Sequence, residues 1–162
     1  MPPDTSPDRA SLPYRPCVGL MLLNDRGHIF VGERIDTPGA WQMPQGGIDP
    51  GEDVTTAGLR ELEEEIGLTP SDVTIEGQTD DWVLYDLPDH LLGKVWGGKY
   101  RGQKQHWLKL RLTAPDSRIN LDTAHPEFTR WKWSTPEQVL DEIVPFKRDM
   151  YERVLRTLVD QP

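Results

Sequence analysis

The stretch from Gly46 to Leu68, GGIDPGEDVTTAGLRELEEEIGL, decides the fold of this chain. Its first part is a loop rich in glycine and proline. Its second part predicts a helix from about Asp53 to Ile66, with Gly67 as the C-cap. Three glutamates of this helix stand at positions i, i+3 and i+4 and therefore share one face: Glu61, Glu64 and Glu65. A different stripe is expected to lie against a sheet, and it consists of Thr55, Leu59, Leu62 and Ile66.

The three carboxylates repel one another by about 1 kcal/mol per pair in water, and by more when they are partly buried. Arg60 is assigned to another part of the helix, so one or more hard divalent cations, Mg²⁺ or Mn²⁺, offset this charge most economically. A solvated acidic helix face is the alternative interpretation of the same residues. Ala57 and Gly58 precede the glutamates, and we expect these small residues to face the ligand and leave room for it.

The whole stretch resembles the Nudix box at each of its fixed positions, which are Gly46, Glu52, Arg60-Glu61-Leu62, Glu64-Glu65 and Gly67-Leu68. The resemblance implies an α/β protein, the Nudix α/β/α sandwich with a mixed β-sheet. It further implies attack of metal-activated water on a phosphoanhydride linked to a nucleoside. Such hydrolysis depends on cations that neutralise phosphate charge and lower the pKa of the attacking water.

The same resemblance assigns roles to individual residues. The implied metal set is Gly46, Glu61, Glu64, Glu65 and, before the last strand, Glu127. Glu52 and Arg60 would be the pair that holds the loop to the helix, and Gly67 a structural residue of the box. The implied catalytic residues are Glu61, Glu64, Glu127 and Arg60. Glu61 is assigned as the general base, with Glu64 and Glu127 as alternatives.

The rest of the sequence predicts strands on both sides of this helix. Strands are expected at residues 17–23, 28–34, 73–76, 81–87, 105–113 and 128–133, and further helices at 135–143 and 146–159. Asn24 to Gly27 predicts a hairpin turn, and the alternating leucines of residues 105–113 predict a half-buried strand. The order indicates a mixed sheet with packed helices. We expect one domain at residues 14–160 after a flexible N-terminal tail at residues 1–13.

Beyond the box, the chain resembles the Nudix branch of bacterial RNA pyrophosphohydrolases and related diadenosine polyphosphate hydrolases. The matching segments are Tyr14-Arg15-Pro16, Trp41 to Ile48, Gly102 to Trp107, Pro126-Glu127-Phe128 and Phe146-Lys147-Arg148. The resemblance implies contacts to phosphate or nucleotide from Arg15, Arg34, Gln45, Gln103, Lys104 and Lys147. Tyr85 and Phe146 are the stacking candidates, although Tyr85 could be a core residue and Phe146 could fasten its helix to the domain.

The charge distribution supports a local anion site. The chain has a formal net charge of -9, which disfavours a protein that wraps nucleic acid with an all-round basic surface. From His90 to Ala114, however, there is no acidic residue, and six of the 18 Lys and Arg residues lie there. Trp96 and Tyr100 are interleaved among them, a composition that grips phosphates and stacks bases. An ordinary solvated loop is the alternative.

Two substrates fit these observations, an RNA 5'-triphosphate end and a dinucleoside polyphosphate. The main interpretation is a magnesium-dependent RNA pyrophosphohydrolase that initiates mRNA decay by removing pyrophosphate and also cleaves dinucleoside polyphosphates. Its alternatives are a dedicated diadenosine tetra- or pentaphosphate hydrolase that releases ATP and a non-catalytic nucleotide-sensing module. The lone Cys17 suits a reducing cytoplasm. We expect neither a membrane anchor nor DNA as a partner, and the oligomeric state stays open.

Overall fold

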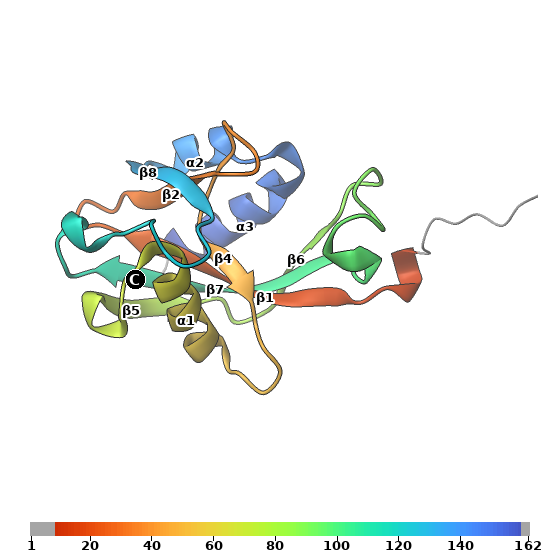
Figure 1. Cartoon of the computed structure of the whole chain (residues 1–162), viewed down its shortest axis with the longest axis horizontal. Helices are drawn as coiled ribbons and strands as arrows, with labels where there is room; N and C mark the ends of the chain where they lie inside the picture. The colour runs from red at the N-terminus through yellow and green to blue at the C-terminus, as the bar shows by residue number, and fades with distance from the viewer. Residues whose placement is uncertain (1–8, 160–162) are drawn as a thin grey trace, which may run out of the picture.

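A mixed β-sheet with helices on both faces forms the described part of the chain, residues 9–159 of the computed structural model. The strands are β1 (Tyr14–Leu23), β2 (Ile29–Arg34), β3 (Trp41–Gln42), β4 (Gln45–Gly47), β5 (Val73–Gln78), β6 (Val83–Asp86), β7 (Gly102–Leu112) and β8 (Phe128–Ser134). The helices are α1 (Val54–Ile66), α2 (Pro136–Glu142) and α3 (Arg148–Val159). Figure 1 shows α1 on one face and α2 with α3 on the other. This confirms the expected α/β/α sandwich.

Strands β1 and β7 form the centre of the sheet. They run parallel from the Tyr14–Gly102 pair to the Leu23–Arg111 pair. The main path is β3-β2-β1-β7-β5, while β4 pairs with β1, β6 with β7 and β8 with β2. Every one of these other pairs is antiparallel, so the sheet is mixed, as predicted. Each of β1 and β7 begins three residues earlier than predicted. The parallel pairing explains this, because the first residues of the two strands hydrogen-bond to each other from the Tyr14–Gly102 pair onward.

The prediction of a half-buried strand at residues 105–113 is wrong. Leu108 and Leu110 are buried on the side of α1, and Trp107 is buried on the side of α3. Lys109 is also buried, with 7% of its surface exposed. Alternating apolar and polar residues predict a solvent-exposed face of a strand only when nothing packs on that face of the sheet. Here helices pack on both faces of the sheet. The final helix begins at Arg148 because Pro145–Lys147 forms a separate 3₁₀ turn.

The hairpin between β1 and β2 is confirmed. The side chain of Asn24 accepts hydrogen bonds from the main-chain N–H groups of Arg26 and His28, at 3.0 and 2.9 Å. Gly27 has a φ of 77°, in the left-handed region that glycine adopts without a steric cost. The turn therefore fixes the register in which β2 returns beside β1.

Helix α1 has the predicted boundaries. The Asp53 carboxylate caps its first turn by accepting from the N–H of Thr56 at 2.7 Å, and Gly67 ends it with a φ of 75°. The predicted orientation needs correction, because Gly58 faces the sheet and not the ligand. A Cβ on Gly58 would overlap the side chain of Leu108. The two small residues, Ala57 and Gly58, therefore let α1 pack closely on the sheet.

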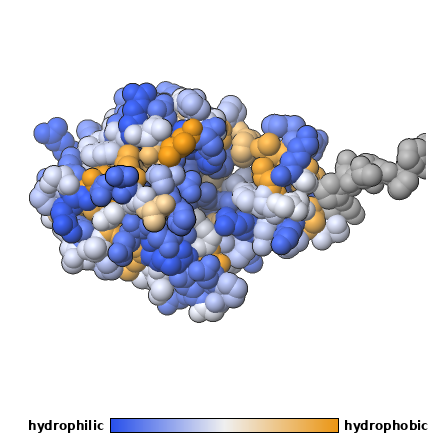
Figure 2. All heavy atoms as spheres, viewed as in Figure 1, coloured by the Kyte–Doolittle hydropathy of each residue, from blue (hydrophilic) through white to orange (hydrophobic). Residues whose placement is uncertain are grey.

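Part of the expected N-terminal tail can be described. Residues 1–8, like residue 160, lie outside the described residues, while Arg9–Ser11 forms a 3₁₀ turn. Arg9 donates a hydrogen bond to Asp89 at 2.9 Å and so contacts the long loop after β6. Within residues 9–159, no helix combines the length and the apolar character needed to span a bilayer. Figure 2 shows hydrophobic residues in small groups among hydrophilic ones on the face in view.

Candidate active site

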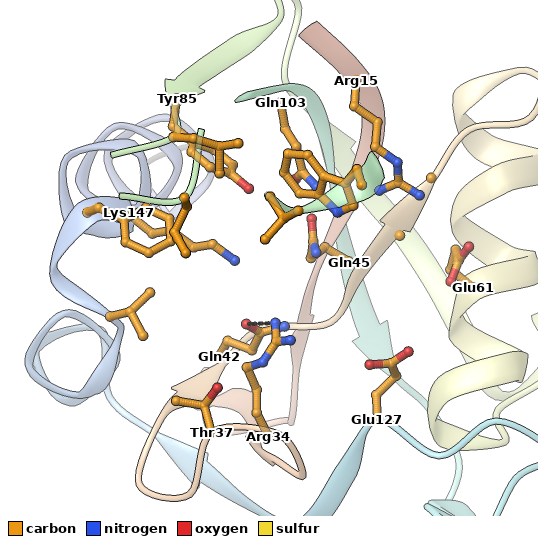
Figure 3. Close-up of a pocket in the computed structure, with 18 of the residues that line it drawn as sticks. Arg15, Arg34, Thr37, Gln42, Gln45, Glu61, Tyr85, Gln103, Glu127 and Lys147 are labelled. Atoms are coloured by element: carbon orange, nitrogen blue, oxygen red, sulfur yellow. Dashed lines mark hydrogen bonds between the residues drawn. The ribbon is translucent and has the colours of Figure 1, made fainter. Parts of the chain in front are cut away.

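A cavity of about 630 Å³ opens between helix α1, strand β4 and the segment before α3. In Figure 3, Glu61 and Glu127 lie on one side of it and Tyr85 and Lys147 on the opposite side, with Gln45 between them. Most of the residues singled out in the sequence line this cavity, from segments far apart in the chain: Arg15, Arg34, Gln45, Gly46, Glu61, Glu64, Glu65, Tyr85, Gln103, Glu127, Phe146 and Lys147.

The loop before α1 is fastened to the helix by Glu52 and Arg60. The guanidinium of Arg60 donates to both carboxylate oxygens of Glu52, at 2.9 and 2.8 Å, and to the carbonyl of Gly47 at 2.9 Å. These bonds to Arg60 lower the pKa of Glu52 to about 2. A bidentate arginine pair of this kind fixes orientation as well as distance. It therefore holds the loop against the acidic face of α1.

Gly46, in strand β4 before α1, lies directly against the carboxylate of Glu61. A Cβ on Gly46 would lie 2.5 Å from Oε1 of Glu61, and the carboxyl carbon lies closer still. Any side chain at this position would therefore displace Glu61. Glu65 is buried beside it and accepts from the main-chain N–H of Gln45. Its Oε2 has no hydrogen-bond partner among the described residues.

Burial disfavours the charged form of two of these glutamates. It raises the pKa of Glu65 well above the usual value and also raises that of Glu61. Arg60 contributes to balancing this charge, since it donates to Glu61 at 2.9 Å and to Glu64 at 3.2 Å. The expectation that Arg60 lies away from the carboxylates was therefore wrong. The buried Oε2 of Glu65 still lacks a partner that would stabilise a negative charge there.

These carboxylates suit a hard divalent cation by their chemistry, because such cations prefer oxygen ligands. One of the oxygen atoms, Oε2 of Glu65, is buried without a hydrogen-bond partner among the described residues. Within residues 9–159, no three His, Cys, Asp or Glu side chains are already gathered into a shell that could hold an ion. Glu61 and Glu64 are instead paired with Arg60. A cation at this wall would therefore compete with Arg60 for the two carboxylates.

The opposite wall combines cations with aromatic rings. The ring centroids of Tyr85 and Phe146 are 6.0 Å apart, and the ammonium of Lys147 lies 5.6 Å from the first and 5.9 Å from the second. Lys147 is buried, which lowers its pKa to about 8. Arg34 reaches the cavity from β2, bonded to Asp36 and, at 3.2 Å, to Gln42. This wall can hold an anion beside a flat ring.

The basic segment at residues 90–114 contributes less charge than its composition predicts. Lys104 does not line the cavity, because it alternates with Gln103 along β7 and its ammonium lies 4.8 Å from the ring of Trp82. Arg101 pairs with Asp86 at 3.2 Å. The cavity wall instead receives apolar residues from this segment, namely Leu91, Val95 and Trp96.

Trp96 has an unusual main chain. It is the one non-glycine residue in the described part of the chain with a positive φ, 52°, and it precedes two glycines that also have positive φ. A left-handed tryptophan is strained, and such strain clusters at functional sites. The guanidinium of Arg15 lies 5.8 Å from the centroid of its ring. The loop therefore places an aromatic ring beside a cation in the cavity.

Sequence reasoning missed several residues of the cavity wall. They are Thr37, Gln42, Gly47, Leu87, Leu91, Val95 and Val144. Trp96 was considered only as one of the aromatic residues in the basic segment at residues 90–114. Gln42 and Gly47 lie in Trp41 to Ile48, a segment that the family resemblance includes without assigning a role to either residue. The apolar residues carried no signal, because isolated leucines and valines are typical of packing.

Comparison with known proteins identifies the domain and its relatives. A NUDIX domain model matches residues 13–154. The chain is 56% identical to a protein named RNA pyrophosphohydrolase from Novosphingobium aromaticivorans, over 90% of this chain and 92% of that protein. It is 51% identical to one of the same name from Rhodospirillum rubrum, over 98% and 94% of the two chains.

Solved structures show the same fold at low sequence identity. A C. elegans Ap4A hydrolase in a binary complex superposes with a TM-score of 0.66 at 21% identity, covering 91% of this chain and 99% of that one. An E. coli dihydroneopterin triphosphate pyrophosphohydrolase gives the same TM-score at 19% identity, covering 89% and 99%. Together with the domain match over most of its length, these likenesses show that the chain belongs to the Nudix family of hydrolases, which act on pyrophosphate bonds and use divalent metal ions.

Proposed function

We propose that this protein is a magnesium-dependent RNA pyrophosphohydrolase that removes pyrophosphate from the triphosphorylated 5' end of RNA. The observation that carries the proposal is the division of one cavity into an acidic wall, a cationic wall and aromatic rings. A nucleoside polyphosphate has the same three parts, namely a cation-bound phosphate chain, free phosphate oxygens and a base. The names of relatives about 50% identical over nearly the whole chain support the choice of RNA.

The chain's own residues have distinct tasks in this proposal. Glu61, Glu64, Glu65 and Glu127 would hold the cations, with Mn²⁺ as a substitute for Mg²⁺. Cations bound there would neutralise phosphate charge and lower the pKa of the attacking water. Glu61 is the proposed general base. Arg60 keeps its carboxylate oriented, and Glu52 keeps Arg60 in place.

Binding of the substrate falls to the other walls. Arg15, Arg34 and Lys147 would contact phosphate oxygens, because their positive charges line the cavity. Tyr85 and Phe146 would hold a base against the ammonium of Lys147. Lys104 is not among the proposed contacts, since its ammonium lies over the ring of Trp82 and its side chain does not line the cavity. An RNA substrate would also place the enzyme in the cytoplasm.

A second activity, cleavage of dinucleoside polyphosphates, is favoured by one observation. The cavity is lined by two sets of aromatic rings, the Tyr85–Phe146 pair and the strained Trp96. A ligand with a base at each end of its phosphate chain could use both. We propose this as an accompanying activity of the same site.

A side-by-side steady-state assay tests the proposal. The protein would receive a short 5'-triphosphorylated RNA and diadenosine tetra- and pentaphosphate, each with Mg²⁺, and the products would be identified. Pyrophosphate released from RNA at the higher kcat/KM is the expected result. Preferential release of ATP from the dinucleotides would make RNA the side activity. No turnover of any of the three would refute the proposed function.

A further inference from the structure

Three glutamines and a tryptophan form a hydrogen-bonded chain from the core to the cavity. The indole N–H of Trp107 donates to Oε1 of Gln105 at 2.8 Å. The amide nitrogen of Gln105 donates to Oε1 of Gln45 at 2.8 Å and to Oε1 of Gln103 at 2.6 Å. Gln103 and Gln105 are each 1% exposed, and Gln45 is half-buried. Both Gln45 and Gln103 line the cavity, as Figure 3 shows.

The direction of this chain is fixed by Trp107. An amide has nearly the same shape in its two flipped forms, so its partners decide its orientation. The indole N–H can only donate, and therefore the amide of Gln105 must present its oxygen to Trp107. Its two N–H hydrogens then point to Gln45 and Gln103, which must present their oxygens in return. The free NH₂ groups of Gln45 and Gln103 are consequently directed away from Gln105.

The tryptophan itself cannot turn. Its ring is fully buried and lies edge to face with Tyr151, with the centroids 5.7 Å apart. On the other side the ring lies against Gly19, where a Cβ would come within 2.5 Å of ring atoms. Its main-chain N–H donates to the hydroxyl of Thr79 at 3.0 Å. The reference point of the chain is therefore rigid.

The two amides stand where a phosphate chain must pass. Gln45 precedes Gly46, which touches Glu61, and its main-chain N–H bonds to Glu65. Gln103 pairs in register with Arg15 across β1 and β7. Ligand atoms between the carboxylate wall and the cationic wall thus meet amide donors. Phosphate oxygens accept hydrogen bonds and do not donate them, so they match these donors.

We infer that Gln105 is a positioning residue that turns the NH₂ groups of Gln45 and Gln103 toward the cavity, where they bind oxygen atoms of the substrate's phosphate chain. The inference rests on the proposed function for the identity of the substrate. Gln105 acts through its two neighbours and does not itself contact the ligand. The fixed donors select for groups that accept hydrogen bonds.

The variant Gln105→Glu tests this inference. Its carboxylate can still accept from Trp107, but its other oxygen accepts as well, so Gln45 and Gln103 must turn their NH₂ groups inward and show carbonyl oxygens to the cavity. Loss of a hydrogen bond to a charged group predicts a rise of about 10-fold or more in KM for 5'-triphosphorylated RNA. The value of kcat should change by less than about 3-fold, because these contacts bind substrate and transition state alike.

A double-variant background separates positioning from the added charge. In a protein with Gln45→Met and Gln103→Met, the further change Gln105→Glu should leave KM unaltered, since nothing remains to be turned. An equal rise in KM in that background would overturn the inference, as would an unchanged KM in the single variant. If Gln105→Glu fails to fold, Gln105→Met replaces it, and a smaller rise in KM is expected. In the protein with Gln45→Met and Gln103→Met, Gln105→Met should likewise leave KM unchanged.

A readout independent of activity distinguishes this inference from the proposed function. In the wild-type protein, side-chain amide protons of the buried Gln105 should exchange slowly with water in NMR spectra, and those of the half-buried Gln45 quickly. In Gln105→Glu, the side-chain amide protons of Gln45 should become slow, because they turn inward. The opposite wild-type pattern would overturn the inference even if RNA is cleaved. Absence of RNA cleavage with the expected pattern would refute only the proposed substrate.

Discussion

Gly46→Ala is the substitution whose effect can be derived most directly from the geometry. The added methyl carbon would lie 2.5 Å from Oε1 of Glu61, whereas non-bonded heavy atoms are comfortable at about 3.5 Å. The carboxylate must therefore move by about 1 Å or more. Gly46 does not have a positive φ, so alanine brings no backbone strain at this position. The damage should fall on the site and not on the fold.

The expected loss of activity follows from that displacement. A misplacement of 1 Å in a catalytic group can lower the rate by about 100-fold. The assay is kcat/KM for a 5'-triphosphorylated RNA with Mg²⁺, beside a thermal melt. Gly51→Ala is the matched control, because Gly51 has a φ of 80° and open space around it. It should cost about 1 kcal/mol of stability and leave kcat/KM unchanged.

Two results would refute this reasoning. If Gly46→Ala kept kcat/KM within about 3-fold of wild type, Glu61 would not need its present position, and its proposed role as base would fall. If Gly51→Ala lost as much activity as Gly46→Ala, the loss would come from destabilising the loop. A melt temperature far below that of Gly51→Ala would mean that the carboxylate had not yielded to the methyl group.

Three further substitutions test the packing and the electrostatics. Gly58→Ala should cost about 1 to 3 kcal/mol of stability, measured by denaturant unfolding, because its methyl group overlaps Leu108. Glu65→Gln should raise the melting temperature of the metal-free protein, because it removes a carboxyl group whose charged form burial disfavours, and it should reduce the stabilisation that wild type gains from millimolar Mg²⁺. Lys147→Met should weaken RNA binding yet stabilise the protein at pH 7 by on the order of 3 kcal/mol, because burial lowers the pKa of Lys147 from 10.5 to about 8. Between about pH 8 and 10.5 only the unfolded chain binds the proton, so the free energy of unfolding of wild type rises with pH. Unfolding curves measured across this range should therefore show the difference in stability between Lys147→Met and wild type disappearing.

The sequence was sufficient to predict the acidic helix and its loop because local signals coincide there. Asp53 and Gly67 mark the ends of α1, and the fixed spacing between Gly46 and Glu65 belongs to a single continuous segment. Contacts within such a segment follow from helix geometry alone. The side of Arg60 was misjudged because its long side chain reaches beyond its own helical position, back to Glu52 and forward to Glu61 and Glu64.

The opposite wall could not be derived from local patterns. Lys104 and Gln103 are neighbours on one strand, and which of them faces the cavity depends on how β7 pairs with β1 and β6. A shift of one residue would exchange the two. The same applies to the glutamine chain, whose members come from β4 and β7 and meet only in the folded sheet. Composition alone therefore overstated the role of the basic segment.

The distribution of charge explains how a protein with a formal net charge of -9 can hold a polyanion. At physiological salt, exposed charges interact over roughly 8 Å, so distant surface carboxylates have little effect inside the cavity. Buried Lys147 is screened much less, and it attracts phosphates that enter. Phosphates that remain outside meet a chain whose formal net charge is negative. The affinity for RNA should therefore come from the first few nucleotides, and extending the RNA beyond them should add little, because the net charge disfavours contacts along a longer strand.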